Sequence, residues 1–191
     1  VVFLEDVLNR AVEQTKQIIL EKNVTTENID ETAHDVGVGA VVFNELSNYR
    51  IKDYVFSWDK VLNFEGETGP YVQYTHARAC SILRRAGEDT VKAAKKGFDT
   101  SWITGESAHH LIKLLYALPE VIKEAGEKYE PSIVTRHIVD IAQGFNKFYH
   151  DEHILVEDEK EKTAKVALVL AVQTAIKNGL GLLGMKAPEK M

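Results

Sequence analysis

The chain has 191 residues, of which 45% are hydrophobic and 27% are charged. This is the balance of an ordinary globular protein, and it excludes disordered, collagen-like and disulfide-stapled classes. The single cysteine, Cys80, cannot form an intrachain disulfide, as expected in a reducing compartment. No apolar run approaches the about 18 residues that would span a bilayer. Because the chain starts at Val1 without an initiator Met or a signal sequence, we expect it to be part of a longer protein.

The net charge is −6, which argues against a nucleic-acid binder that acts through a strong positive field. The charge is unevenly distributed, however. Residues 1–70 contain six basic and 13 acidic residues, whereas residues 71–191 contain 17 basic and 16 acidic ones. Two differently composed regions therefore meet near residue 70, and the second can accept a polyanion if its basic residues cluster.

Two amphipathic helices are predicted before residue 50. Apolar residues recur at three- and four-residue spacing over residues 4–20 and again over residues 25–46, as on the buried face of a helix. Thr26 is the expected start of the second helix. Gly37 and Gly39 lie inside that helix, where each costs about 1 kcal/mol relative to Ala. We therefore expect another helix to cross closely at these glycines.

The next helix is predicted to carry the most informative side chains. Residues 52–58 are typical of extended chain or a single turn, and after a turn-rich break Pro70 suits the first position of a helix that reaches about Arg85. One stripe of this helix can face a core. Its members are Val72, Thr75, Ala79, Leu83 and Ala86. Tyr71, Tyr74 and Arg78 occupy an adjacent stripe.

The remaining sequence also predicts helices. Residues 87–105 read as a loop with a short helix near residues 91–96, and Pro119 separates two further helices, 107–118 and 120–128. Pro131 opens a helix with a clean apolar face. The face consists of Ile138, Ile141, Ala142, Phe145, Phe148 and Tyr149. A last helix over residues 160–183 buries one alanine- and leucine-rich side. Its members are Ala164, Ala167, Leu168, Ala171, Ala175 and Ile176. The predicted architecture is an all-α helical bundle.

Several motifs that resemble chemical sites have simpler structural interpretations. Residues 179–184 match the dinucleotide fingerprint GxGxxG, but they follow a helix rather than a strand, so we interpret them as a tightly packed helix end. His150 and His153 with the acidic residues between them form a weak metal-like cluster, and a solvated helix end is the favoured interpretation. The acidic residues 157–161 favour the start of a helix through its dipole. No catalytic residue and no metal site is therefore predicted.

The Tyr71, Tyr74 and Arg78 stripe leaves two interpretations open. Two tyrosines and a guanidinium one or two turns apart offer stacking planes for unpaired bases and a forked donor for base edges or phosphate. Alternatively, both tyrosines lie in the core with satisfied hydroxyls and Arg78 is an ordinary surface residue. Periodicity alone favours the second interpretation.

Three blocks of sequence resemble the arginyl-tRNA synthetase family. Residues 37–59 contain GVGAVVF, LSN and KDYVF, residues 66–78 read GETGPYVQYTHAR, and residues 145–191 contain FNKFY, GL followed by LLG, and the final APEKM. The blocks occur in the family's order over nearly the whole chain. Neither the HIGH-type nor the KMSKS-type motif of the family's ATP site is present.

The resemblance implies a division of the chain and a division of labour. Residues 1–66 would be the tail of the catalytic region, and residues 67–191 a DALR-type anticodon-binding helical domain. The full-length arginine–tRNA ligase would attach arginine to its tRNA with ATP and Mg, whereas this part would bind no cofactor and be catalytically inactive. We expect few direct RNA contacts from the acidic residues 1–35.

The resemblance also implies a tRNA anticodon-binding site. By motif match it consists of six residues. They are Tyr71, Tyr74, Arg78, Tyr149, His153 and Met191. The expected partners are an arginine-accepting tRNA and the catalytic domain of the same chain, with neither DNA nor a membrane, in the cytoplasm. The alternative is a helical protein–protein interaction module without RNA affinity, which would expose a contiguous apolar patch.

Overall fold

The computed structural model describes residues 2–21 and 28–191. Over these residues the chain forms eight α-helices, one 3₁₀ helix and no strand, which confirms the predicted all-α class. In chain order the helices are α1 (Leu4–Glu21), α2 (Ile29–Ser47), α3 (Trp58–Val61), α4 (Gly69–Ala86), α5 (Glu88–Lys96), α6 (Glu106–Lys128), α7 (Ser132–Asp151) and α8 (Glu159–Leu182), and the 3₁₀ helix is Thr100–Trp102.

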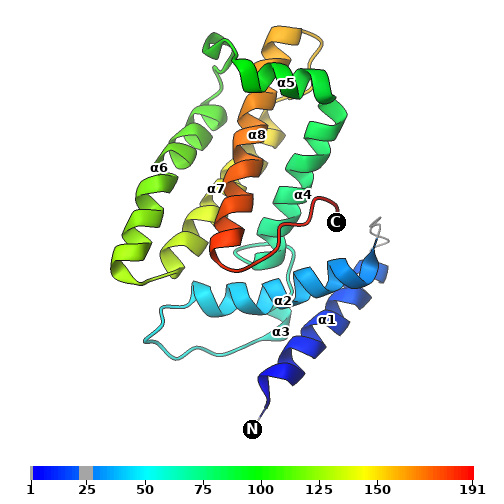
Figure 1. Cartoon of the computed structure of the whole chain (residues 1–191), viewed down its shortest axis with the longest axis vertical. Coiled ribbons are helices and arrows are strands. Elements are labelled where there is room, and N and C mark those ends of the chain that lie inside the picture. Colours follow the sequence, from blue (N-terminus) through cyan, green and yellow to red (C-terminus); the bar gives the residue numbers. More distant parts are fainter. Residues whose placement is uncertain (1, 22–27) are drawn as a thin grey trace.

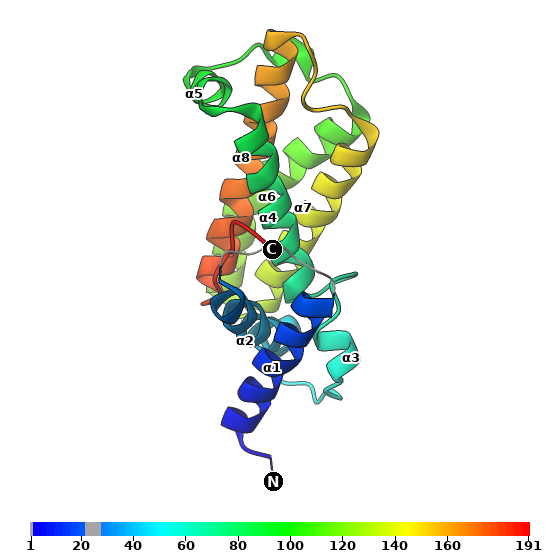
Figure 2. The ribbon, with the colours of Figure 1, turned by 90° about the vertical axis from the view of Figure 1, so that its right-hand side faces the viewer.

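Four long helices form a bundle, and the shorter elements close its two ends. Helices α4, α6, α7 and α8 run alongside one another, α5 lies across one end and α2 across the other (Figure 1). Helix α1 packs on α2 and carries the N-terminus away from the bundle (Figure 2). The architecture therefore places the start of α4, where Tyr71 lies, at the junction between the bundle and the α1–α2 pair.

The bundle is held by one large apolar core. The predicted faces of α4 and α7 supply it, since Val72 and Ala79 of α4 are fully buried and so are Ile138 and Phe145 of α7. Tyr149 does not belong to that buried face, because 42% of it is exposed. A second, smaller cluster joins α1, α2 and α3. Its members are Ala11, Ala40, Val41, Val61 and Leu62. Phe43 of α2 packs into the large core, so α2 contributes to both clusters. The predicted domain boundary between residues 66 and 67 therefore stays a prediction.

Glycines mark two close helix contacts, as the sequence predicted. A Cβ atom added to Gly37 would lie 2.8 Å from the backbone of Ala11, so α1 and α2 approach to backbone contact. A Cβ atom on Gly179 would lie 2.5 Å from Cγ2 of Ile138. The dinucleotide-like motif is thus the packed end of α8. Gly184, with φ of 74°, ends the helix, and the Met185 N–H donates to the Leu180 carbonyl at 2.9 Å in a Schellman arrangement.

The prediction of a helix break at Pro119 is wrong. Helix α6 continues through Pro119, and because this residue is exposed, the carbonyl that loses its helical partner can be hydrated. Ala171 was assigned to the buried side of α8, but it is exposed. Between α4 and α6 the helix begins at Glu88 rather than near residue 91. The proposed cap Thr26 lies outside the described residues, and Asn28 caps α2 by accepting from the Glu31 N–H.

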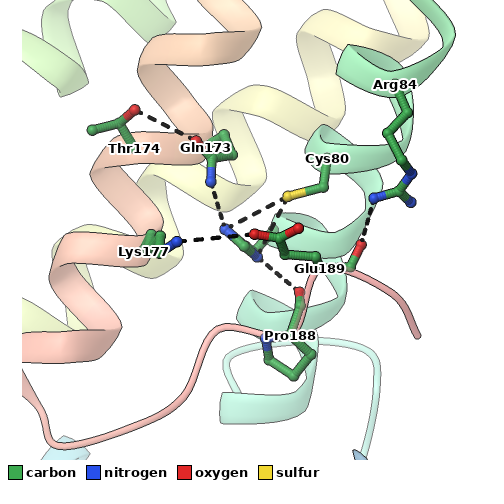
Figure 3. A network of polar contacts seen from close by, with 8 residues as sticks. Cys80, Arg84, Gln173, Thr174, Lys177, Pro188 and Glu189 are labelled. Atoms are coloured by element: carbon green, nitrogen blue, oxygen red, sulfur yellow. Dashed lines mark hydrogen bonds and ion pairs between the residues drawn. The ribbon is translucent and has the colours of Figure 1, made fainter. Parts of the chain in front are cut away.

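The segment after α8, residues 183–191, returns along α4 and is called the tail below. Its apolar residues Leu183 and Met185 are buried in the core. Beyond them the backbone is held by hydrogen bonds, and Figure 3 shows Pro188 and Glu189 lying between α8 and the side of α4 that carries Cys80 and Arg84. The fully buried His76 contacts the Pro188 carbonyl through Nδ1 at 2.8 Å. A hydrogen bond from α4 therefore holds the tail backbone against the side of this helix.

The burial of His76 predicts a pH-dependent stability. Loss of hydration lowers the pKa of His76 below its ordinary value of 6.5, although its hydrogen bond to the Pro188 carbonyl opposes this; of the charged neighbours, Lys177 lowers the pKa and Glu189 raises it. Below pH 6.5 the His76 imidazole is therefore protonated in the unfolded chain but stays neutral in the folded chain. The contribution of neutral His76 to the free energy of unfolding is fully present above pH 6.5. It falls by up to about 1.4 kcal/mol per pH unit as the pH drops towards the folded-state pKa.

Thermal melting between pH 7.5 and 5.5 checks this expectation. The loss of melting temperature on acidification should be smaller in His76→Asn than in the unmodified chain. His110→Asn, which changes an exposed histidine, is the matched control and should alter the acid sensitivity less than His76→Asn does. Equal acid sensitivity of His76→Asn and the unmodified chain would contradict the prediction.

Candidate nucleic-acid interface

Local sequence signals determine how α4 presents its tyrosines. Thr68 caps the helix by accepting from the Tyr71 N–H at 3.2 Å, and Pro70 lies in the first turn, where its missing N–H costs nothing. Val72 and Ala79 point into the core. The 100° spacing of the helix then places Tyr71, half-buried, and Tyr74, 39% exposed, on the neighbouring face towards solvent.

Asn146 of α7 connects three side chains of α4. Its Nδ2 donates to the hydroxyl of Tyr71 at 2.9 Å and to Oγ1 of Thr75 at 3.2 Å. Its Oδ1 accepts from Nη1 of Arg78 at 2.6 Å. One amide therefore orients a tyrosine hydroxyl and a guanidinium at once. Asn146 belongs to the FNKFY block, but no spacing rule within the sequence pointed to this role.

Arg78 lies between two partly exposed aromatic rings. Its Cζ atom is 5.0 Å from the centroid of the Tyr74 ring and 5.5 Å from that of Tyr149, within the range of cation–π attraction. Tyr74 and Tyr149 are 39% and 42% exposed. Both rings thus keep a surface for an incoming planar group, while the cation between them is held in place by Asn146.

A cavity of about 470 Å³ opens beside these side chains. We call it the tyrosine groove. It is lined by Ile18, Ile19, Thr32, Phe64, Glu65, Tyr71, Tyr74, Arg78, Asn146 and Met191. The groove combines apolar walls with a few polar groups, as ligand sites for planar molecules do. Ile18 and Ile19 of α1 and Phe64 show that the acidic N-terminal region contributes apolar side chains here, a contribution that composition alone does not reveal.

A second, more polar groove adjoins the first across Tyr74 and Arg78. We call it the basic groove. It is lined by Tyr74, Ala77, Arg78, Ser81, Arg84, Lys190 and Met191. Three cationic side chains therefore gather here, although the whole chain carries a net charge of −6. An apolar cavity beside a cationic groove suits single-stranded nucleic acid, whose bases stack and whose phosphates are anionic.

Four of the six predicted site residues line the tyrosine groove, a fifth contacts one of these four, and the sixth does neither. Tyr71, Tyr74, Arg78 and Met191 line the tyrosine groove, and Tyr149 contacts Arg78. His153 is exposed after the end of α7, where its carbonyl accepts from Nζ of Lys165 at 3.1 Å.

The described residues, 2–21 and 28–191, contain neither a candidate metal site nor a candidate membrane span. These residues contain no group of three or more His, Cys, Asp or Glu side chains that could hold a metal ion. Within the same ranges no helix has the length and apolar character needed to cross a membrane.

Comparisons with known proteins identify the family. A model of the DALR anticodon binding domain matches residues 72–191, the part of the chain that carries α4 and the tail. The chain belongs to the DALR anticodon-binding family. A second model, the catalytic domain of class I tRNA synthetases of the arginine type, matches residues 1–58. The DALR match therefore follows a segment that is similar to the class I catalytic domain.

Similar proteins extend over the whole chain. The arginine–tRNA ligase of Halothermothrix orenii is 56% identical over 191 residues, which are 100% of this chain and 33% of that protein. The arginyl-tRNA synthetase of Thermus thermophilus superposes with a TM-score of 0.91 at 34% identity, covering 100% of this chain and 32% of that one. Plasmodium falciparum arginyl-tRNA synthetase, at 24% identity, a TM-score of 0.86 and coverage of 100% and 34%, shows the same fold. This DALR-family chain spans about a third of the length of the curated relatives.

Proposed function

We propose that this chain is the tRNA anticodon-binding part of an arginine–tRNA ligase. The observation that carries the proposal is that Tyr74 and Arg78 line the tyrosine groove, while Arg78 also contacts the partly exposed ring of Tyr149. A base splayed out of the anticodon loop can stack on an exposed tyrosine ring, while Arg78 donates to its edge or to a phosphate. We assign this role to Tyr71, Tyr74, Arg78, Tyr149 and Met191, with His153 as an outlying member.

The proposal extends to the longer protein. Arginine attachment would use ATP and Mg in a catalytic domain of the same chain, in the cytoplasm, with an arginine-accepting tRNA as substrate. Residues 1–66 would connect to that domain and residues 67–191 would bind the anticodon. The family membership supports tRNA binding and does not favour the alternative of a protein–protein module.

Binding measurements with the purified chain test the proposal. We expect salt-dependent binding of an arginine-accepting tRNA, because phosphate contacts release counterions, and weaker binding of a tRNA with a different anticodon. Equal affinity for both tRNAs, or no affinity at low salt, would contradict the proposal. We also expect no arginine-dependent ATP–pyrophosphate exchange by this chain. Detectable exchange would contradict the expectation that this part of the ligase is catalytically inactive.

A further inference from the structure

Three side chains of α4 hold the tail by donating hydrogen bonds to three of its backbone carbonyls. Gln73 Nε2 donates to the Lys186 carbonyl at 2.9 Å, His76 Nδ1 to the Pro188 carbonyl at 2.8 Å, and Arg84 Nη1 to the Glu189 carbonyl at 3.1 Å. Figure 3 shows Pro188 and Glu189 beside α4 and α8. These bonds immediately precede Lys190 and Met191, which line the grooves.

His76 is fixed by partners on both sides of its ring. With Nδ1–H donating to Pro188, the neutral ring leaves Nε2 as an acceptor, and Gln173 Nε2 of α8 lies 3.0 Å from it. Burial favours that neutral form. The ring is fully buried, so neither hydrogen bond can be replaced by water without opening the structure. His76 therefore bridges α8 to the tail in a single orientation.

Gln73 makes a second fixed bridge. It is also fully buried, and its Nε2 donates both to the Asp35 carbonyl of α2 at 3.1 Å and to the Lys186 carbonyl of the tail. A Cβ atom on Gly39 would lie 2.9 Å from this nitrogen, so the glycine leaves room for the amide. Leu183, Met185 and Ala187 anchor the first part of the tail in the core. Glu189 and Lys190 are exposed, so the end of the tail depends more on hydrogen bonds.

We propose that Gln73 and His76 are positioning residues for tRNA recognition, which act by holding the tail so that Met191 borders the tyrosine groove. Neither side chain lines that groove. Without the two donors the end of the tail would move in the free protein and become ordered only when tRNA binds. The conformational entropy lost at that step would then oppose binding. The inference rests on the proposed function of the tyrosine groove.

A matched pair of amide substitutions in the full-length ligase tests the role of His76. The amide nitrogen of His76→Asn can occupy the place of Nδ1 and keep the donor to Pro188, whereas that of His76→Gln reaches the place of Nε2 and loses this donor. We expect kcat/KM for tRNA to fall about tenfold in His76→Gln and clearly less in His76→Asn. The KM values for ATP and arginine should not change. Equal losses in both variants would overturn the proposal.

Gln73→Met provides an independent variant in case His76→Gln does not fold. Oε1 of Gln73 is buried without a hydrogen-bond partner, so a methionine of similar length removes the donor to Lys186 while filling the same volume. It should lower kcat/KM for tRNA and leave the ATP and arginine constants unchanged. A folded Gln73→Met enzyme with unchanged tRNA kinetics would overturn the role of Gln73.

Combination with Met191→Ala separates positioning of the tail from a general structural effect. If His76 acts through the tail, the double variant should lose no more than the worse single variant, because the same contact is removed twice. Multiplying losses would overturn the proposal. If Tyr74→Ala and Met191→Ala both bind tRNA normally, the proposed groove function itself fails. If both weaken binding and His76→Gln does not, only the positioning role fails.

Discussion

Replacing Tyr74 with alanine in the full-length ligase should weaken tRNA recognition by about 1–3 kcal/mol, the usual contribution of one base stacked on an aromatic ring. The Tyr74 ring is 39% exposed at the junction of the two grooves. Its loss also removes one of the two rings that flank Arg78. The defect should appear in kcat/KM for tRNA, because the proposed site would supply binding and positioning rather than chemistry.

Two further substitutions make the Tyr74 result specific. Tyr74→Phe keeps the stacking ring and should retain most of the activity if stacking dominates over a hydroxyl contact. Tyr116→Ala removes a tyrosine that is 86% exposed on α6, outside both grooves, and should leave tRNA kinetics unchanged. Equal losses for tRNA, arginine and ATP in Tyr74→Ala would indicate a folding defect and remove the support for this site.

Replacing Lys165 with methionine should destabilise the folded chain by about 2–3 kcal/mol, because it leaves two partly buried carboxylates without their cation. Lys165 is 7% exposed, and its Nζ lies 3.1 Å from Glu152, 2.8 Å from Glu161 and 3.1 Å from the His153 carbonyl. Burial lowers the pKa of Lys165, but the hydrogen bonds to Glu161 and Glu152 outweigh it, so the pKa is raised overall. The ammonium therefore stays charged and holds the turn between α7 and α8.

Thermal melting of the isolated chain measures this effect. For a domain of this size the expected loss corresponds to about 4–12 °C. Adding Glu152→Gln should restore part of the stability, since it removes one orphaned charge. Lys92→Ala breaks the exposed pair with Glu88, at 2.9 Å, and should change stability by less than about 1 kcal/mol. A melting temperature of Lys165→Met within 2 °C of the parent would show that the cluster contributes little.

Sequence patterns were most successful where local chemistry determines the structure. The Pro70 signal located the start of α4, where Thr68 caps the helix, and the acidic run at residues 157–161 marked the start of α8, where Asp158 caps the helix. The prediction failed at Pro119, because the cost of a proline in a helix depends on whether the freed carbonyl meets water or core. That depends on the surrounding fold rather than on the residue's neighbours in sequence.

The sequence by itself determined the helical class, most helix boundaries and which residues share the Tyr71, Tyr74 and Arg78 stripe of α4, because periodicity and capping act over a few residues. It did not determine whether that stripe is exposed. Only the tertiary structure decided which side chains meet that stripe. Asn146 reaches Tyr71 across 75 positions, and His76 reaches Pro188 across 112. Such contacts depend on the relative height and rotation of packed helices, which spacing along one helix does not encode. The grooves arise from that packing, and the resemblance to a family could name their residues without showing how they are held.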